Sequence, residues 1–352
     1  MHISINERLR PFNHELGTMS PVPGSRWCVQ VFPSLIRLYD LSCKELRLLG
    51  IIHVDIQGPV TGFTLQLDLE KGFLHVWGNS LKGYFRYRIA ASLHGEKLLI
   101  KNEKETHPIS FSSDSELISI SNLEPYTIGF FDRLSLGVHK AQEWTLIKKR
   151  LDFKEIFPIW LKLGQLMSPA HEEGKLGTAS FLTGAEELIC QKNKTDLLNH
   201  FQRLFLTGFY GLMTPTLVDH HHQGIHLEDP SPTSSPLVLL SYGAKLIRSL
   251  FVSFQDSHLS VLPALPVEFH SGRFLHVRLE NLGLLDLEWS KKTVRRMILL
   301  TEEKCTISLG LPKQIKRFRF KEEQEKTASF LEAGCKLHLE KGKAYFFDRF
   351  EK

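Results

Sequence analysis

The sequence predicts a mainly β protein with a helical insert: an N-terminal antiparallel β-sandwich, a short middle region of about four helices and a C-terminal β-sandwich. Apolar and polar residues alternate near both ends of the chain, which is typical of half-buried strands. Between these ends, apolar residues recur at helical spacing. The segment LPALP, residues 262–266, then stops the helical pattern, because proline cannot continue a helix. We therefore expect domains at residues 1–150, 151–258 and 259–352.

The composition favours a soluble globular protein, with 42% hydrophobic and 24% charged residues. The net charge of +5 is spread along the chain, so we expect no nucleic-acid partner. Lys245 and Arg248 interrupt the longest apolar run, so we expect no membrane span. The N-terminus shows no signal-peptide pattern, and the five cysteines form no CxxC pair, which indicates a reducing, cytoplasmic location. We expect no cofactor, and the sequence leaves the oligomeric state open.

The N-terminal strands are predicted by a period of two. Phe63, Leu65, Leu67 and Leu69 alternate with polar residues, which predicts a strand with one buried face. Clusters of Gly, Asn, Ser and Asp separate further short strands. These are expected at residues 27–31, 35–39, 51–56, 73–77, 85–89, 98–101 and 117–120.

The stretch from Asp132 to Asp152 allows two interpretations. It could line a ligand groove in which Trp144 stacks on a sugar ring. It could instead be a last strand followed by a basic linker, with Trp144 in the domain interface, and charge runs of this kind are usually solvated. Trp160, Trp77 and Tyr84 raise the same choice between sugar stacking and core packing.

Four helices are expected in the middle region, at residues 153–166, 178–191, from 195 to about 212, and 235–254. Ser235 can cap the last of them, and Pro236 suits its first turn. This helix is apolar on nearly all sides, so we expect it to be buried.

The first polar loop of the middle region, residues 167–177, contains Glu172 and Glu173. Two adjacent carboxylates could act as a general acid or base. A solvated acidic loop is the alternative, and we favour it.

The second loop, residues 214–236, has an unusual density of histidines and carboxylates. Its candidate catalytic residues are Asp219 and Glu228, and its candidate ligand-binding residues are His220, His222, Gln223 and His226. Metal binding through Asp219–Asp229 is one hypothesis, but the three consecutive histidines match no standard ligand spacing, so we expect no metal. A polar ligand-binding or catalytic loop and a functionally inert loop are the alternatives.

Strands return after the proline segment. Leu275, Val277 and Leu279 alternate with Phe274, His276 and Arg278. After a turn, Leu285, Leu287 and Trp289 alternate with Asp286 and Glu288. Further strands are expected at residues 294–300, 306–309, 315–320, 336–339 and 345–347.

Part of this region resembles a known family. The segment from Leu259 to Pro266, followed by Gly272, Leu285, Leu287 and Trp289, is similar to the end of inverting glycoside hydrolases and phosphorylases built on a six-hairpin α/α barrel, especially the α-L-fucosidase type. The resemblance covers about 60 residues and implies the same order of domains. A barrel of twelve helices needs on the order of 200 residues, whereas only about 110 lie between Asp152 and Val261. Most of the barrel is therefore missing, and no catalytic residue is carried over.

Three functional hypotheses follow. We favour a protein that binds an oligosaccharide, or serves as an interaction module, without the catalysis of a complete barrel. The second is an active inverting glycoside hydrolase that pairs Glu172 or Glu173 with Asp219 or Glu228. The third is a metal-binding protein that uses the Asp219–Asp229 loop.

Overall fold

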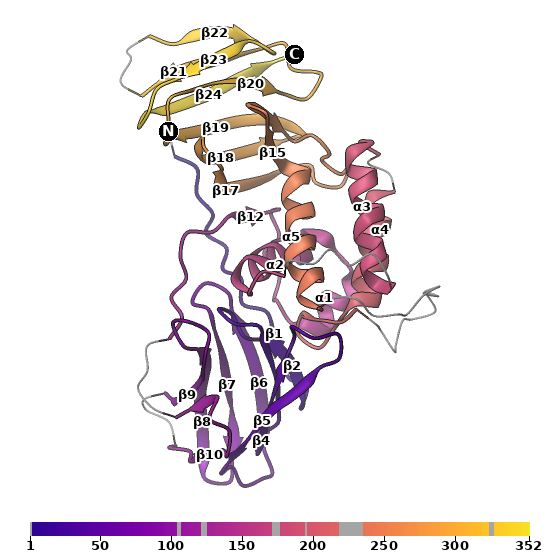
Figure 1. The fold of residues 1–352 in the computed structure, drawn as a ribbon, viewed down its shortest axis with the longest axis vertical. Helices are drawn as coiled ribbons and strands as arrows, with labels where there is room; N and C mark the ends of the chain where they lie inside the picture. The colour runs from indigo at the N-terminus through magenta and orange to yellow at the C-terminus, as the bar shows by residue number, and fades with distance from the viewer. Residues whose placement is uncertain are drawn as a thin grey trace.

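The computed structural model describes residues 2–103, 107–120, 125–170, 177–193, 196–217, 235–323 and 327–352. Figure 1 shows strands at both ends of an elongated molecule and helices between them. The prediction of a mainly β protein with a helical middle region is confirmed. None of the described helices is both long and apolar enough to cross a membrane.

Two sheets form the N-terminal region. The first has six strands in the order β1 (Phe12–Asn13), β6 (Thr61–Asp68), β7 (Phe73–Ser80), β8 (Gly83–Ala91), β9 (Leu98–Asn102) and β11 (Ile118–Ser119). The second has five, in the order β10 (Phe111–Ser112), β5 (Arg47–Val54), β4 (Leu35–Asp40), β3 (Trp27–Val31) and β2 (Thr18–Pro21). All described pairings here are antiparallel except that of β9 with β11. Strand β6 lies where the period-two pattern predicts it, and Leu65 and Leu67 are fully buried. Its other face is not open to solvent, because Thr64 and Asp68 on that face are buried as well.

The helical region contains five described helices rather than four: α1 (Trp144–Arg150), α2 (Phe153–Leu166), α3 (Ser180–Cys190), α4 (Leu197–Gly208) and α5 (Leu237–Phe251). A short 3-10 helix, η1 (Gly177–Ala179), precedes α3, and a small hairpin of β13 (Phe209–Tyr210) and β14 (Thr214–Pro215) follows α4. Helix α1 was not predicted, because its seven residues are too few to display a clear helical period. The Ser235 hydroxyl accepts from the Leu237 N–H at 3.1 Å and donates to the Leu41 carbonyl at 2.6 Å, so it ties the start of α5 to the N-terminal region.

Helices α2 and α5 pack very closely. A Cβ atom on Gly164 would lie 2.3 Å from the Leu240 carbonyl oxygen and 2.6 Å from the Ala244 Cβ, so only glycine fits there. The Trp160 indole N–H donates to the Leu239 carbonyl at 3.0 Å. The close contact explains why α5 is apolar on most sides: it is buried against α2.

Two sheets form the C-terminal region. One has seven strands in the order β12 (Arg133–Ser135), β17 (Gly272–Leu279), β18 (Gly283–Ser290), β19 (Thr293–Thr301), β24 (Ala344–Glu351), β21 (Arg317–Glu322) and β22 (Ser329–Glu332). The other has four: β15 (Val252–Gln255), β16 (His258–Val261), β20 (Cys305–Gly310) and β23 (Lys336–Leu339). The prediction that the last helix reaches Phe254 was wrong, because β15 begins at Val252 and pairs with β16. Strand β12 lies within residues 1–150 but pairs with β17.

An N-terminal strap, residues 2–10, connects the two ends of the molecule. It starts beside the seven-stranded sheet and runs to β1 (Figure 1). Side chains from three regions hold its backbone. At its start, Arg296 donates to the His2 carbonyl and Arg273 donates to the Ser4 carbonyl. Further along, Arg133 donates to the Glu7 carbonyl, and Glu70 accepts from the Leu9 N–H. Because these contacts are hydrogen bonds to main-chain groups, they depend little on the strap's own side chains.

Candidate functional site

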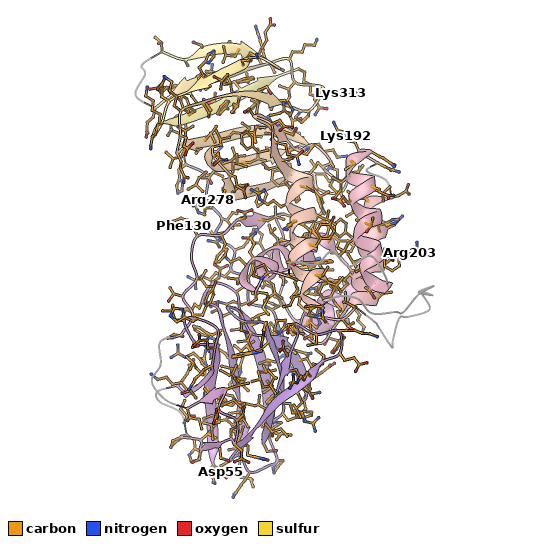
Figure 2. The ribbon with its side chains drawn as sticks, in the orientation of Figure 1. Asp55, Phe130, Lys192, Arg203, Arg278 and Lys313 are labelled. Atoms are coloured by element: carbon orange, nitrogen blue, oxygen red, sulfur yellow. The ribbon has the colours of Figure 1, made fainter. Side chains whose placement is uncertain are left out.

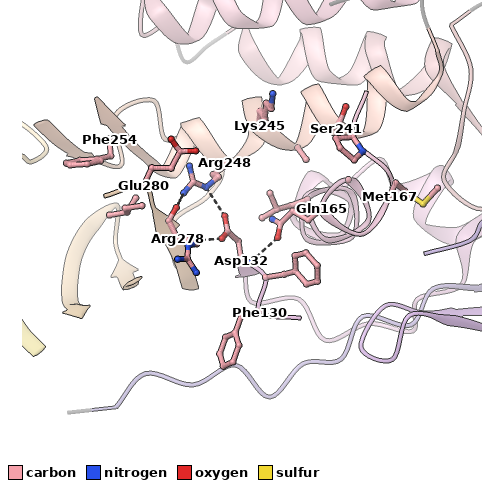
Figure 3. A pocket seen from close by; sticks show the side chains of 16 residues that line it. Phe130, Asp132, Gln165, Met167, Ser241, Lys245, Arg248, Phe254, Arg278 and Glu280 are labelled. Atoms are coloured by element: carbon pink, nitrogen blue, oxygen red, sulfur yellow. Dashed lines mark hydrogen bonds and ion pairs between the residues drawn. The ribbon is translucent and has the colours of Figure 1, made fainter. Parts of the chain in front are cut away.

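A pocket that we call the seam pocket lies where the helical region meets the seven-stranded sheet. Its volume is about 660 Å³. Helices α2 and α5, the linker before β12 and the end of β17 contribute its walls. Figure 2 places Phe130 and Arg278 at this junction, far from Asp55 at the end of the N-terminal region. The polar residues of the pocket are shown in Figure 3.

Asp132 is the central polar residue of the seam pocket. It is 7% exposed, and its Oδ2 accepts from Arg248 Nε at 2.8 Å. Its Oδ1 accepts from the backbone N–H of Arg278 at 3.3 Å, and its own N–H donates to Gln165 Oε1 at 3.0 Å (Figure 3). Arg248 also donates through Nη2 to the Arg278 carbonyl. One aspartate therefore joins the linker to α5, β17 and α2.

Burial controls the ionisation of this region. It raises the pKa of Asp132, even though the Arg248 guanidinium, the Arg278 N–H and Lys162 all lower it. Lys162 of α2 is 6% exposed and lies over the Phe131 ring, 4.9 Å from its centroid. Burial lowers the pKa of this amine, which the nearby carboxylate of Glu70 partly opposes. For both groups, the loss of hydration outweighs the favourable interactions with fixed protein groups, so the charged forms are less favoured here than in water.

One face of α5 supplies further polar groups. Ser241, Lys245 and Arg248 all line the pocket and are spaced i, i+4 and i+7, so they lie on one face of the helix. Lys245 is exposed and has no ion-pair partner among the described residues. The amide nitrogen of Gln165 is buried and also lacks a hydrogen-bond partner in the part of the chain that is described. The exposed amine of Lys245 therefore remains available to a ligand.

An exposed aromatic ring lies at the mouth of the pocket. Phe130 is 83% exposed, and its ring centroid lies 5.7 Å from that of His276 in an edge-on contact. His276 has a positive φ of 59° and lies in an irregularity of β17 between Phe274 and Val277. The Asp286 Oδ1 accepts from the His276 N–H at 2.8 Å, which holds this conformation. The β-bulge therefore turns the imidazole toward Phe130.

The structure separates the candidate residues predicted from the sequence into two groups. Eight lie outside the described residues: Glu172, Glu173, Asp219, His220, His222, Gln223, His226 and Glu228. The two tryptophans proposed to bind ligand are described, and both are core residues. Trp144 and Trp160 are 1% and 0% exposed, so neither indole presents a face on which a sugar could stack. This corrects the ligand-binding interpretation in favour of core packing.

The two surface aromatics differ from those tryptophans. Tyr84 is 41% exposed, and Trp77 is partly exposed, with the Arg86 guanidinium 5.6 Å from its ring centroid. A cation already covers Trp77, so it offers less free ring surface than Phe130 does.

Sequence reasoning did not identify Phe130, Asp132, Gln165, Arg248 and Arg278 as one site. In the sequence, Lys245 and Arg248 stand out only as interruptions of an apolar helix. A charge on an otherwise buried helix needs a partner or a cavity, and this was the available signal. Its partner, Asp132, lies 116 residues away and could not be found from local spacing.

The arrangement favours binding of a polar, uncharged or weakly charged small molecule. Oriented hydrogen-bonding groups surround a cavity that also has apolar walls from Leu161, Met167 and Phe254. Among the described residues, no group of three or more His, Cys, Asp or Glu side chains is placed to hold a metal ion. No protein-family model matches the sequence, and no curated protein matches it significantly.

Proposed function

We propose that this protein binds a carbohydrate in the seam pocket and acts as a binding or interaction module. The observation that carries the proposal is the highly exposed ring of Phe130 at the mouth of a cavity with a fixed Asp132–Arg248 pair. A sugar has an apolar C–H face and a polar rim of hydroxyls. The aromatic ring suits the face, and charged hydrogen-bonding groups suit the hydroxyls.

The dimensions of the pocket fit a small saccharide. Its volume of about 660 Å³ falls within the range of about 300–1,000 Å³ that is common for small-molecule sites. Asp132 and Arg248 are held by each other and by the backbone of Arg278, so little side-chain order has to be gained on binding. We expect a mono- or disaccharide to be the best ligand.

The sequence resemblance of residues 259–289 to the six-hairpin family favours the same class of ligand. We infer that the two N-terminal sheets form one sandwich and that the two C-terminal sheets form another. We also infer that the chain divides into domains at residues 1–150, 151–258 and 259–352. The five described helices are fewer than half of the twelve in a complete six-hairpin barrel. A reduced helical region is more compatible with binding than with the chemistry of that barrel. The five unpaired cysteines support a cytoplasmic location.

The test is a glycan-array screen of the whole protein, followed by calorimetric titration of any ligand found. Phe130→Ala should weaken binding about tenfold or more while the fold is kept, because the ring is exposed. Phe330→Ala is the matched control, since Phe330 is 49% exposed on β22, a strand that contributes nothing to the pocket. Equal affinity of the two variants, or no glycan bound at all, would contradict the proposal.

A second candidate is glycoside hydrolysis in the same pocket. Asp132 and Glu280 both line it, and burial raises the pKa of Asp132, as a general acid requires. A carboxylate on the opposite side of the sugar could activate water. Under this hypothesis, Asp132→Asn and Glu280→Gln should each abolish release of sugar from a bound glycoside. If the wild-type protein bound a glycoside without hydrolysing it, the hydrolase hypothesis would be contradicted and the binding proposal would remain.

A further inference from the structure

A second pocket lies on the seven-stranded sheet and is separate from the seam pocket. Its volume is about 600 Å³, and no residue lines both. The strap contributes Asn6 and Glu7, the segment after β12 contributes His139, and strands β17 to β19 contribute Arg273, Glu288 and Arg295. We call it the basic pocket.

The carboxylate of Glu288 is neutralised by two arginines. Arg273 Nε lies 3.0 Å from Oε1, and Arg296 Nε lies 2.6 Å from Oε2. Burial acts to raise the pKa of Glu288, but the hydrogen bonds from Arg296 and Arg273 outweigh it and hold the pKa below its ordinary value. This carboxylate is therefore charged at neutral pH and already shared by two cations, so it repels an incoming anion only weakly.

Arg295 is the cation that remains available. It is exposed, it lines the pocket, and it has no ion-pair partner in the described part of the chain. A guanidinium presents a planar fork of donors that matches phosphate and sulfate oxygens. Lys291 and Lys292 form the adjoining turn between β18 and β19, and neither has an ion-pair partner among the described residues.

The charge around the basic pocket is positive overall. In the lining itself, Arg273 and Arg295 balance the carboxylates of Glu7 and Glu288. Three further cations lie beside the lining: Arg296, which pairs with Glu288, and the two lysines of the turn. His139 Nε2 lies 3.3 Å from Glu7 Oε1, so the second carboxylate also has a partner. Such an excess of cations around a concave surface favours an anionic ligand.

Hydroxyl groups complete the pocket. Ser135, Ser271 and Ser290 line it, and each can donate a hydrogen bond to an oxyanion. Gly272 lies between them, where a Cβ would be 2.3 Å from the Trp289 ring and 2.7 Å from the Ser135 carbonyl oxygen. Glycine thus lets β12 and β17 approach closely and brings the serines of different strands to one surface.

We propose that the basic pocket binds a phosphate or sulfate group, either as the free ion or as an ester on a sugar. The guanidinium of Arg295 and the serine hydroxyls hold the oxyanion, and the lysines of the turn add to its attraction. This site does not depend on carbohydrate binding in the seam pocket.

The experiment titrates the whole protein with inorganic phosphate, inorganic sulfate and glucose 6-phosphate, with glucose as the uncharged probe, followed by calorimetry and amide NMR. Saturable binding of the anions, with shifts at Ser290 and its neighbours, is expected. Arg295→Gln should weaken it about tenfold or more, because a charge-assisted hydrogen-bond pair is lost. Glucose 6-phosphate binding tighter than phosphate would identify the sugar ester as the ligand, and equal affinity would identify the free ion.

Arg47→Gln is the matched control. Arg47 is exposed at the start of β5, in the N-terminal region, and has no ion-pair partner among the described residues, so the variant makes the same change in net charge. Its affinity for the anions should equal that of the wild type. Equal weakening in both variants would mean that net charge alone attracts the ions, and that result, or the absence of saturable binding, would overturn the proposal. Circular dichroism of both variants checks that the fold is kept.

Discussion

The carboxylate of Asp132 in the seam pocket and that of Glu288 at the basic pocket are both held by arginines, yet their pKa values move in opposite directions. Asp132 has one guanidinium and one backbone N–H, and burial outweighs them, so its pKa is raised. Glu288 has two guanidinium partners and lies nearer to water, so its pKa is lowered. The number of partners and the degree of burial, rather than the presence of an arginine, therefore decide in which direction the pKa of a carboxylate shifts.

The opposite shifts give opposite dependences of stability on pH. The pKa of Glu288 is lower in the folded protein than in the unfolded chain, where it is near 4.5. Glu288 therefore stabilises the fold at pH values above about 4.5, and this contribution is lost as the pH falls through the folded pKa. The pKa of Asp132 is higher in the folded protein than in the unfolded chain, where it is near 3.8. Its contribution to stability is therefore fully present at pH values below about 3.8 and is lost as the pH rises through the folded pKa. The first arrangement suits a permanently charged surface, and the second suits a site where protonation can change.

The largest expected effect comes from a change that disrupts the seam pocket and leaves the basic pocket intact. Gly164→Ala would place a Cβ 2.3 Å from the Leu240 carbonyl oxygen, so α2 and α5 would have to separate. We expect a loss of about 3 kcal/mol in the free energy of unfolding, at the upper end of ordinary overpacking. Gly129→Ala is the control, because a Cβ there meets nothing within 4 Å. Urea denaturation of both variants measures the difference, and similar midpoints would contradict the close helix contact.

Asp132→Ala tests the buried side of the comparison. It leaves the Arg248 guanidinium and the Arg278 N–H without their acceptor, and we expect a loss of about 2 kcal/mol. Asp348→Ala removes the partner of Arg319 in the seven-stranded sheet. It should cost less, because Asp348 is only partly buried, whereas Asp132 is buried and also accepts from a backbone N–H. Thermal unfolding of the two variants ranks them. A larger loss of stability for Asp348→Ala than for Asp132→Ala would show that burial does not determine the size of the loss.

A pH series sharpens the same comparison. Glu288→Gln should cost about 1 kcal/mol at pH 7. The difference from the wild type should shrink as the pH falls below about 4.5, where Glu288 of the unfolded chain becomes protonated, and it should vanish below the lower pKa of the folded protein. Asp132→Asn should show the reverse trend. As the pH rises through the folded pKa of Asp132, the free energy of unfolding of the wild type should decrease relative to that of the variant. Denaturation curves between pH 3 and pH 7 give both slopes. Parallel curves for the two variants would remove the contrast between the sites.

The strands were predictable because their signal is local. Alternation between Phe63 and Leu69 is enough to specify β6, since each side chain of a strand faces the opposite side from the next. The pairing of β12 with a C-terminal strand was not predicted, because its signal is not local. Strand β12 has three residues, and its partner β17 begins more than 130 residues later in the chain.

The seam pocket could not be predicted for the same physical reason. Asp132, Gln165, Arg248 and Arg278 come from four segments and meet only because α2, α5 and β17 pack together. In the sequence, Arg248 only interrupts an apolar run, and its partner is found only in the tertiary structure. The exposed Phe130 carries no sequence signal at all, since its neighbour Phe131 is half-buried and the two are chemically identical.

Phe130→Ala should have the smallest effect on stability and yet a clear effect on function. Its side chain is 83% exposed and makes an edge contact with His276, so truncation should change the free energy of unfolding by no more than about 0.5 kcal/mol. Saccharide binding should nevertheless fall, because the ring supplies the stacking surface at the mouth of the pocket. Differential scanning fluorimetry and calorimetric titration of the same sample separate the two quantities. A large loss of stability would mean that Phe130 is a packing residue, and its exposure could then no longer support a ligand site.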